Sequence, residues 1–162
     1  MEKNKLHQSY NELIKKNNNS AILILENGDV FKGFGFGAQG FKIGEVCFNT
    51  SMSGYQEIIT DPSYNGQIIN FTFPHIGNVG TNRDDNEAKK SFASGIITRE
   101  PPPEASNWRS ELNFNGWLKK QNIVGISGLD TRQLTKVVKE KNAPMGLICH
   151  KFNSQFDLDL LS

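Results

Sequence analysis

Cysteine is scarce in this chain, with only Cys47 and Cys149 among 162 residues. The two lie in the apolar strings EVCF and LICH, and no pair has the C-x-x-C spacing of a redox or zinc motif. This scarcity excludes a disulfide framework and a cysteine-based zinc site. Because each cysteine falls within a strand pattern and not on a tight turn, we predict two buried structural thiols.

An excess of charge of one sign is also missing. The 18 basic and 17 acidic residues leave a net charge of +1, so the chain lacks the basic footprint of a nucleic-acid-binding protein. Basic residues between Lys119 and Lys141 alternate with apolar positions, which indicates the solvated face of a helix. No apolar run has the length of a membrane span, and the first residues have no signal-peptide core. We therefore expect a cytoplasmic protein that binds neither nucleic acid nor membrane.

Motifs for nucleotide binding, serine catalysis and metal binding are absent or incomplete. Gly33–Gly37 is rich in glycine, but it opens a strand pattern and no Gly-Lys-Ser/Thr occurs, which argues against a phosphate-binding loop. Gly125–Gly128 approaches a nucleophile elbow, but its second glycine comes one position early. His75 has no histidine at ligand spacing, so a structural hydrogen bond is the favoured interpretation. We predict no catalytic residue, metal or cofactor in this chain.

Sequence patterns typical of β-strands dominate the first half of the chain. The hydrophobic content of 36% and charged content of 22% are typical of one globular domain. The continuous apolar run Ala21–Leu25 predicts a strand covered on both faces. Asn27-Gly28 predicts a type I′ hairpin that leads into a strand over 30–36. A further strand over 44–49 completes an expected β-meander.

Helix and strand signals alternate in the middle of the chain. Residues 55–60 predict a short helix, which Pro62 ends because it drives Asp61 out of the helical region. The alternation of Ile69, Phe71 and Phe73 with polar residues predicts a half-buried strand. Another strand is expected over 94–99.

The last third of the chain continues this alternation. A helix over 114–121 is expected to lead into a strand over 123–126. Asp130 caps the clearest helix, with Gln133 at the capping-box position and Asn142 as the residue that ends it. A last strand is expected over 147–149. The whole pattern predicts an α/β fold with layered mixed sheets and helices on one side.

The chain divides into three expected segments. Residues 1–20 form an N-terminal extension, expected to be mobile, in which Leu6, Tyr10, Leu13 and Ile14 fall at helical spacing. Residues 21–150 form the globular domain. Residues 151–162 are expected to begin a connection to a further domain.

Small polar residues gather between the apolar strands in the first half of the chain. So many donors and acceptors need partners, either in buried turns or in a ligand, and a structural role is favoured for most of them. The cluster comprises Asn49, Thr50, Ser51, Ser53, Gln56, Ser63, His75 and Asn78.

Several unusual strings occur in an order that resembles one known family. They are LENG, GEV-x-FNTSM-x-GYQEI-x-TDPSY, PHIGNVGTN, GIITRE, SNWR and NIVGISGLDTRQLT. Together they cover about residues 21–148 and resemble the N-terminal domain of the small subunit of glutamine-hydrolysing carbamoyl phosphate synthetase. Strings of this length seldom occur together in one order by chance.

The resemblance implies a layered β/β/α fold of the swivelling type that docks on a large synthetase subunit. The complete enzyme makes carbamoyl phosphate from glutamine, bicarbonate and ATP for pyrimidine and arginine synthesis, with ATP and Mg²⁺ on the large subunit. The serine of TDPSY, here Ser63, corresponds to a residue that helps bind glutamine at the interface with the amidotransferase domain. Tyr55, Tyr64, Phe73 and His75 are candidates for the docking surface, with a core position favoured for Phe73.

This chain departs from that family in one important respect. Neither cysteine lies in the Gly-x-Cys-x-Gly setting of the family's glutaminase nucleophile, so the Cys–His–Glu set is absent and the chain alone is expected to be inactive. Smaller departures are Ala88, where serine is usual, and Asn142, where glycine is usual. Two alternatives stay open: a stand-alone binding or scaffold domain, including a non-catalytic remnant, and an independent catalyst that uses the polar cluster.

Overall fold

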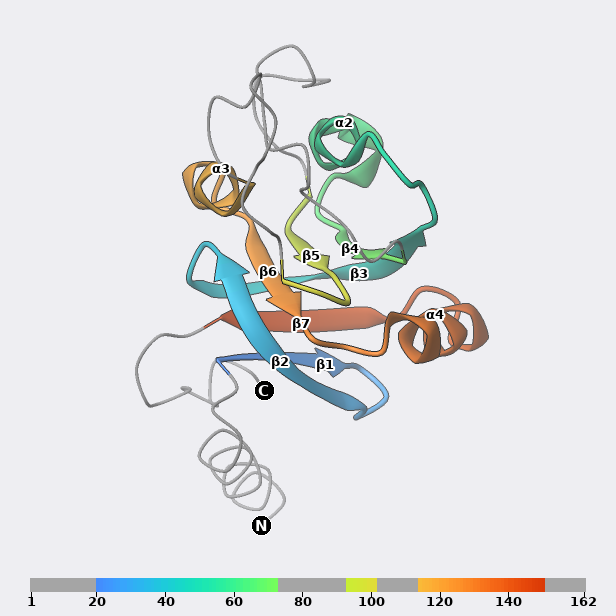
Figure 1. Cartoon of the computed structure of the whole chain (residues 1–162). Coiled ribbons are helices and arrows are strands. Elements are labelled where there is room, and N and C mark those ends of the chain that lie inside the picture. The colour runs from blue at the N-terminus through green and yellow to red at the C-terminus, as the bar shows by residue number, and fades with distance from the viewer. Residues whose placement is uncertain (1–19, 73–92, 102–113, 151–162) are drawn as a thin grey trace.

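Seven strands form a closed barrel in the computed structural model, which describes residues 20–72, 93–101 and 114–150. Within these ranges three α-helices and one 3-10 turn accompany the strands (Figure 1). The elements are β1 Ala21–Leu25, β2 Val30–Gly37, β3 Gly40–Asn49, α2 Tyr55–Thr60, η1 Pro62–Tyr64, β4 Ile68–Phe71, β5 Gly95–Ile97, α3 Phe114–Lys120, β6 Val124–Ser127, α4 Thr131–Glu140 and β7 Met145–His150. The predictions for residues 1–19, Phe73, His75 and Asn78 lie outside the described residues.

The barrel is a mixed sheet with the strand order β1-β2-β6-β5-β4-β3-β7. The strands β3, β4, β5 and β6 pair in parallel. The pairs β1–β2, β2–β6, β1–β7 and β3–β7 are antiparallel. The predicted α/β class with mixed pairing is therefore confirmed.

The first hairpin forms as predicted, but its turn type was predicted wrongly. A type I′ turn requires positive φ at both central residues. Here Gly28 has a φ of 94°, and Asn27 is not among the residues with positive φ. Gly28 N–H donates to Leu25 O, and Leu25 N–H donates to Asp29 O, both at 2.9 Å. This is a three-residue loop closed by a glycine in the left-handed region, which is the next most common hairpin connection.

The prediction of a β-meander is wrong, because β2 does not pair with β3. The strand β2 begins beside β1, where Ala21 is opposite Gly33, and continues beside β6, where Phe34 is opposite Ser127. The change of neighbour occurs at Gly33, where an added Cβ would collide with the Ser127 carbonyl oxygen. The absence of a side chain at this position lets β2 turn the corner of the barrel.

The strand β4 is buried on both faces, so the prediction of a half-buried strand is also wrong. All four of its residues are buried. Its neighbours β3 and β5 pair with it on both edges. Ile68 points into the barrel, and Ile69 and Phe71 point outward under the helices. Burial on both faces is the usual condition of a parallel strand.

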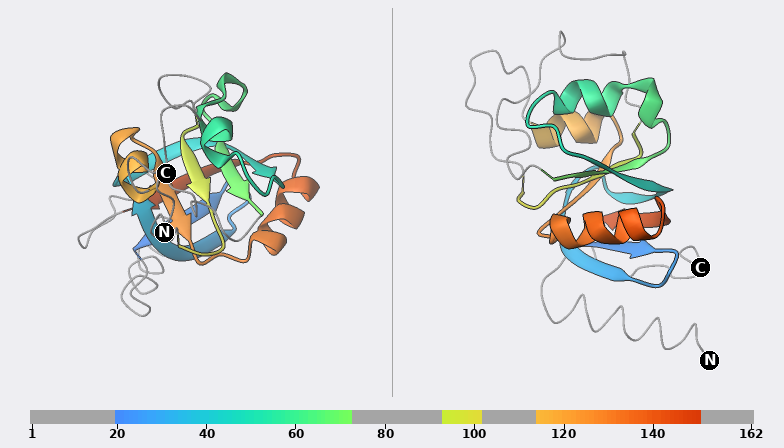
Figure 2. Two further views of the ribbon diagram at one scale, coloured as in Figure 1. Left: turned by 45° about the horizontal axis from the view of Figure 1, so that its top comes forward. Right: turned by 90° about the vertical axis from the view of Figure 1, so that its right-hand side faces the viewer.

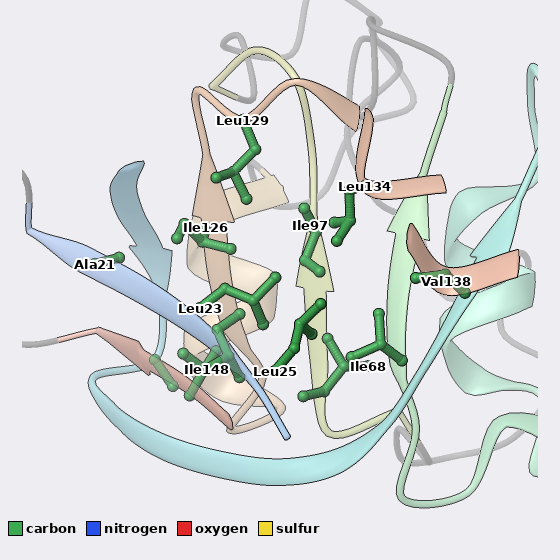
Figure 3. Close-up of a cluster of buried hydrophobic side chains, with 13 residues drawn as sticks. Ala21, Leu23, Leu25, Ile68, Ile97, Ile126, Leu129, Leu134, Val138 and Ile148 are labelled. Carbon is green, nitrogen blue, oxygen red and sulfur yellow. The ribbon is translucent and has the colours of Figure 1, made fainter. Parts of the chain in front are cut away.

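Aliphatic side chains fill the interior of the barrel (Figure 3). Leu23 and Leu25 of β1 belong to this cluster. The same cluster contains Ile148 of β7, Ile97 of β5 and Ile126 of β6. Alternate residues of β1 contribute to this core, as the two-residue period of a strand requires.

A second apolar cluster lies outside the barrel, under α2 and α3 (Figures 1 and 2). The Tyr55 ring of α2 meets the Phe114 ring of α3 edge to face, with 4.8 Å between their centroids. Trp117 and Leu118 point inward, as predicted for this helix. The two helices therefore cover the outer wall formed by β4, β5 and β6.

The helix α4 closes one end of the barrel. Asp130 caps it as predicted, because its carboxylate accepts hydrogen bonds from the N–H groups of Arg132 and Gln133 at 3.1 Å each. Leu134 of α4 extends the interior cluster. The helix ends where predicted, since Asn142 takes a φ of 55°. No helix in the described ranges is both long and apolar enough to cross a membrane.

Buried Asn70 of β4 fastens α4 to the barrel. Its side-chain nitrogen donates to Thr131 O at 3.3 Å and to Thr135 Oγ1 at 3.1 Å. Its side-chain oxygen is the buried atom that lacks a partner within the described part of the chain. A buried amide with two donated bonds ties strand and helix together, and the orphaned oxygen makes the site sensitive to substitution.

Candidate functional site

Ser63 lies on a short turn between α2 and β4. The Asp61 carboxylate accepts a hydrogen bond from Ser63 N–H at 2.9 Å, and Asp61 O accepts one from Tyr64 N–H at 3.0 Å. Pro62 fixes the first position of this turn, and Asp61 is extended, with φ −72° and ψ 123°. The Ser63 side chain is exposed, and its hydroxyl has no hydrogen-bond partner within the described part of the chain. The turn therefore presents a free hydroxyl on a preorganised backbone.

Asn49 connects this turn to the ends of β3 and β4. Its side-chain nitrogen donates to Tyr64 Oη at 3.0 Å, and its side-chain oxygen accepts from Ser51 N–H at 2.8 Å. Its carbonyl oxygen accepts from Thr72 N–H at 3.1 Å and from Thr72 Oγ1 at 3.2 Å. For Asn49 the predicted structural role is confirmed, because its polar atoms bind the chain itself.

The rest of the predicted polar cluster separates into exposed and buried residues. Thr50, Ser51 and Ser53 are exposed in the loop that follows β3 and precedes α2. Gln56 is buried at 3% exposure, so it does not belong to a surface. The loop also presents Met52, which is 72% exposed and which the sequence reasoning missed. The sequence feature that could have indicated the exposure of Met52 is its position as an apolar residue between Ser51 and Ser53.

The prediction that Tyr55 belongs to the docking surface is wrong, because its side chain is buried. Tyr55 has 8% exposure and packs against Phe114, so its ring belongs to the core under α2 and α3. The first residue of a short helix faces inward here, in the cluster that also holds Phe71 of β4. Tyr64 is half-buried and accepts the bond from Asn49, so it supports the Ser63 turn.

The residues considered for serine catalysis and phosphate binding have structural roles instead. Ser127 is buried and donates to Phe34 O at 3.3 Å, so it is no exposed nucleophile. Gly33–Gly37 lies within β2 and does not lead into a helix. Within the described ranges no group of three or more potential ligands could hold a metal ion.

Both thiols lie within strands, as predicted, but Cys47 is only partly buried, whereas a buried thiol was predicted there. Burial raises the pKa of the Cys47 thiol to about 11, so this thiol is protonated and poorly nucleophilic at neutral pH. Its Sγ lies 3.7 Å from Ile68 O. Cys149 of β7 is buried.

The only histidine among the described residues is His150, at the end of β7, where it is opposite Ala21 of the barrel interior. It is 3% exposed, and its Nδ1 lies 3.1 Å from Ala38 O. Burial lowers the pKa of this imidazole below its ordinary value. An added Cβ at Gly35 would collide with the imidazole ring, so β2 leaves room for it. The described part of the Ser63 site thus offers hydrogen-bonding groups for a ligand but no base beside a nucleophile.

Comparison with known proteins gives one consistent family. A family model described as the carbamoyl-phosphate synthase small chain, CPSase domain, matches residues 23–148. The carbamoyl phosphate synthase small chain of Bradyrhizobium diazoefficiens is 51% identical over 143 residues, which cover 86% of this chain and 36% of that protein. The protein of the same name from Vibrio cholerae is 55% identical over 129 residues, which cover 80% of this chain and 34% of that protein. The chain therefore spans about a third of the length of these curated relatives.

Similarity to solved structures is weaker. An aminopeptidase from Aneurinibacillus sp. strain AM-1 matches with a TM-score of 0.45 and 12% identity, over 93% of this chain and 39% of that chain. A likeness at this level supports no conclusion about function.

Proposed function

Because this chain belongs to the family of the carbamoyl-phosphate synthase small chain, CPSase domain, we propose that it acts as the N-terminal domain of a glutamine amidotransferase subunit. In this proposal the globular domain of residues 21–150 has a layered β/β/α swivelling-type fold. Residues 1–20 precede it as an extension, and residues 151–162 lead toward an amidotransferase domain. The protein works in the cytoplasm.

The proposed role is to dock on the large synthetase subunit and to complete the glutamine site. The complete enzyme is a carbon–nitrogen ligase that forms carbamoyl phosphate from glutamine, bicarbonate and ATP, for pyrimidine and arginine synthesis. ATP and Mg²⁺ are bound by the large subunit. This chain contributes binding and not bond breaking, because neither of its cysteines has the sequence setting of a glutaminase nucleophile.

The observation that carries the glutamine-binding proposal is the exposed Ser63 hydroxyl on its braced turn. Asp61 holds the Ser63 backbone N–H, and Asn49 holds Tyr64 beside it. A hydroxyl fixed in this way loses little conformational entropy when it binds a ligand. Its donor and acceptor capacity suits the amide, ammonium and carboxylate groups of glutamine.

Replacement of Ser63 by alanine tests this role in a complete small chain assembled with its large subunit. We expect the KM for glutamine to rise about 3- to 10-fold with little change in kcat, because one hydrogen bond to bound substrate is lost. Synthesis from free ammonia should be unchanged. The matched control is Ser53→Ala, which removes another exposed hydroxyl from the neighbouring loop. Equal KM values for Ser63→Ala and wild type would refute a contact with glutamine.

Docking is tested by co-purification of this chain with a large synthetase subunit. We expect a complex at micromolar concentration and no turnover of glutamine by this chain alone. The Met52→Ser variant reports whether the exposed loop after β3 belongs to the interface, and Gln39→Ser, exposed between β2 and β3, serves as control. Absence of a complex would favour the stand-alone binding or scaffold domain.

A further inference from the structure

A pocket of about 340 Å³ lies where the C-terminal end of α4 meets β3. The helix α4 packs against β3 and β4 at this end of the barrel (Figure 1). The pocket is lined by Cys47, Phe48, Val138, Lys139, Asn142 and Ala143. We call these six residues the β3–α4 pocket. Its volume lies at the lower end of the range for small-molecule sites, about 300–1,000 Å³. None of the six residues has a role in the proposed function.

The inner part of the β3–α4 pocket is apolar. Val138 is 3% exposed, and Cys47, Phe48 and Ala143 are half-buried. Val138 belongs to the interior cluster of the barrel, and Phe48 packs against that cluster. With its pKa raised to about 11, the Cys47 thiol is protonated at neutral pH and adds no charge to this wall. The pocket therefore offers an uncharged surface to the apolar part of a ligand.

The exposed residues of the pocket, Lys139 and Asn142, provide its free polar groups. Lys139 Nζ lies 5.2 Å from the centroid of the Phe48 ring, a cation–π contact that holds the ammonium group beside the apolar wall. Within the described part of the chain this ammonium group has no carboxylate partner, and the Asn142 amide has no hydrogen-bond partner. An ammonium and an amide N–H both donate hydrogen bonds, so they complement a negatively charged acceptor.

The backbone around the pocket favours a single negative charge on the ligand. Ala143 N–H donates to Val138 O at 2.9 Å, and Asn142 N–H donates to Lys139 O at 3.3 Å. These carbonyl groups at the end of α4 are therefore already bonded and do not attract a cation. The negative end of the helix dipole nevertheless disfavours a dianion such as a phosphate monoester. One carboxylate beside one ammonium group fits this balance.

The wall formed by Asn142 and Ala143 is held in an uncommon backbone conformation. Both residues have a φ of 55°, a left-handed conformation that alanine rarely adopts. The bond from Ala143 to Val138 fixes this segment on α4, and Val46 N–H fixes it on β3 by donating to Pro144 O at 2.9 Å. Residues held in such conformations concentrate at ligand sites. Because this wall is ordered before a ligand arrives, binding costs little conformational entropy.

We propose that the β3–α4 pocket binds a small monocarboxylate with an apolar or aromatic body. The carboxylate accepts hydrogen bonds from the Lys139 ammonium group and the Asn142 amide. The apolar body packs against Phe48, Val138 and Ala143. This inference does not depend on the proposed function, because it uses no residue of the Ser63 turn.

Titration of the full chain with 3-phenylpropionate, followed by the backbone amide NMR signals, tests the proposal. We expect saturable shifts at the amides of the β3–α4 pocket. The dissociation constant should be on the order of 1 mM, as is usual for a ligand of about 11 non-hydrogen atoms. The uncharged analogue 3-phenylpropionamide has the same size, and it should bind about 3- to 5-fold more weakly because its interaction with the ammonium group lacks a charge.

Two variants assign the effect of charge to particular residues. Lys139→Gln should weaken binding of 3-phenylpropionate about 3- to 5-fold and leave binding of 3-phenylpropionamide unchanged. Asn142→Asp, which keeps a residue that tolerates the left-handed conformation, should abolish binding of 3-phenylpropionate and favour 3-phenylpropylamine instead. The matched control is Lys120→Gln at an exposed position of α3, which should alter neither affinity.

Three results would overturn the proposal. The first is equal affinity for 3-phenylpropionate and its amide in the wild-type chain, and the second is an unchanged affinity for 3-phenylpropionate in Lys139→Gln. The third is the absence of saturable shifts in the pocket, including the case in which shifts occur only elsewhere, for example at the exposed side chains of Phe41 and Ile43.

Discussion

Replacement of Gly33 by alanine is expected to lower the free energy of unfolding by about 3 kcal/mol, the upper end of the usual cost of overpacking. For a chain of this length that corresponds to a melting temperature lower by about 10 °C. The added Cβ would collide with the Ser127 carbonyl oxygen and lie 3.0 Å from Ile126 Cγ1. A carbonyl in a strand cannot rotate away as a side chain can. The strands β2 and β6 must separate at the corner where β2 changes its neighbour.

Gly28→Ala is the matched control for this effect. Gly28 has a φ of +94° and no atom within 4 Å of an added Cβ, so only the backbone conformation is strained. We expect a loss of about 1 kcal/mol for a non-glycine residue in the left-handed region. Denaturant unfolding of both variants gives the comparison. If Gly33→Ala were no less stable than Gly28→Ala, the close approach of β2 to β6 would not limit the barrel.

Replacement of Asn70 by aspartate is expected to cost about 4 kcal/mol at neutral pH, in the range found when a charge is buried without a partner. The amide donates to Thr131 O and to Thr135 Oγ1, whereas a carboxylate offers only acceptors. The Thr135 hydroxyl already donates to Thr131 O at 2.7 Å, so it cannot turn to the carboxylate without losing that bond. The expected result is a loosened α4 and a melting temperature lower by about 10 °C.

The pH dependence of the Asn70→Asp variant distinguishes a buried charge from a packing defect. Burial raises the pKa of the introduced carboxyl above its unfolded value. The stability of the folded state is then greatest below the unfolded pKa, where the group is neutral, and is lost as the pH rises through the folded pKa. The deficit relative to wild type should therefore shrink on acidification. Asn65→Asp, at an exposed position, should change stability by less than about 0.5 kcal/mol at any pH. A deficit that is constant with pH would contradict the mechanism.

Local signals in the sequence predicted where the helices begin and end. The pairing of strands that are far apart in the sequence could not be predicted from such signals. The helix α2 ends at Thr60 because Asp61-Pro62 follows, and α4 begins after Asp130 because its carboxylate caps the first turn. Both signals lie within a few residues of the boundary they set. The neighbours of β2 are decided by Gly33 and by a strand about 90 residues later in the chain. A meander was predicted because sequential strands are neighbours in most sheets, but β2 and β3 are not neighbours in this barrel.

The candidate site likewise combines features that neighbouring residues determine with contacts between residues far apart in the sequence. The Ser63 turn follows from Asp61 and Pro62, which are adjacent to it in sequence. The brace from Asn49 to Tyr64 crosses 15 residues and depends on how β3 and η1 meet. The inward position of Tyr55 depends on Phe114, which is more distant still. Neither contact has a sequence signal of its own, so the partner of Asn49 was not predicted and Tyr55, a core residue, was assigned to the surface.

The closure of the barrel has a consequence for the order in which the chain folds. The strand β1 completes its hydrogen bonds only with β7, where Ala21 is opposite His150. During synthesis β1 and β2 emerge before the other described strands and form their hairpin, but one edge of β1 stays unpaired until β7 leaves the ribosome. Until then the parallel strands β4, β5 and β6 also lack a closed interior. The barrel is thus assembled late and from contacts far apart in sequence, a topology that folds slowly and leaves a strand edge open to other chains on the way.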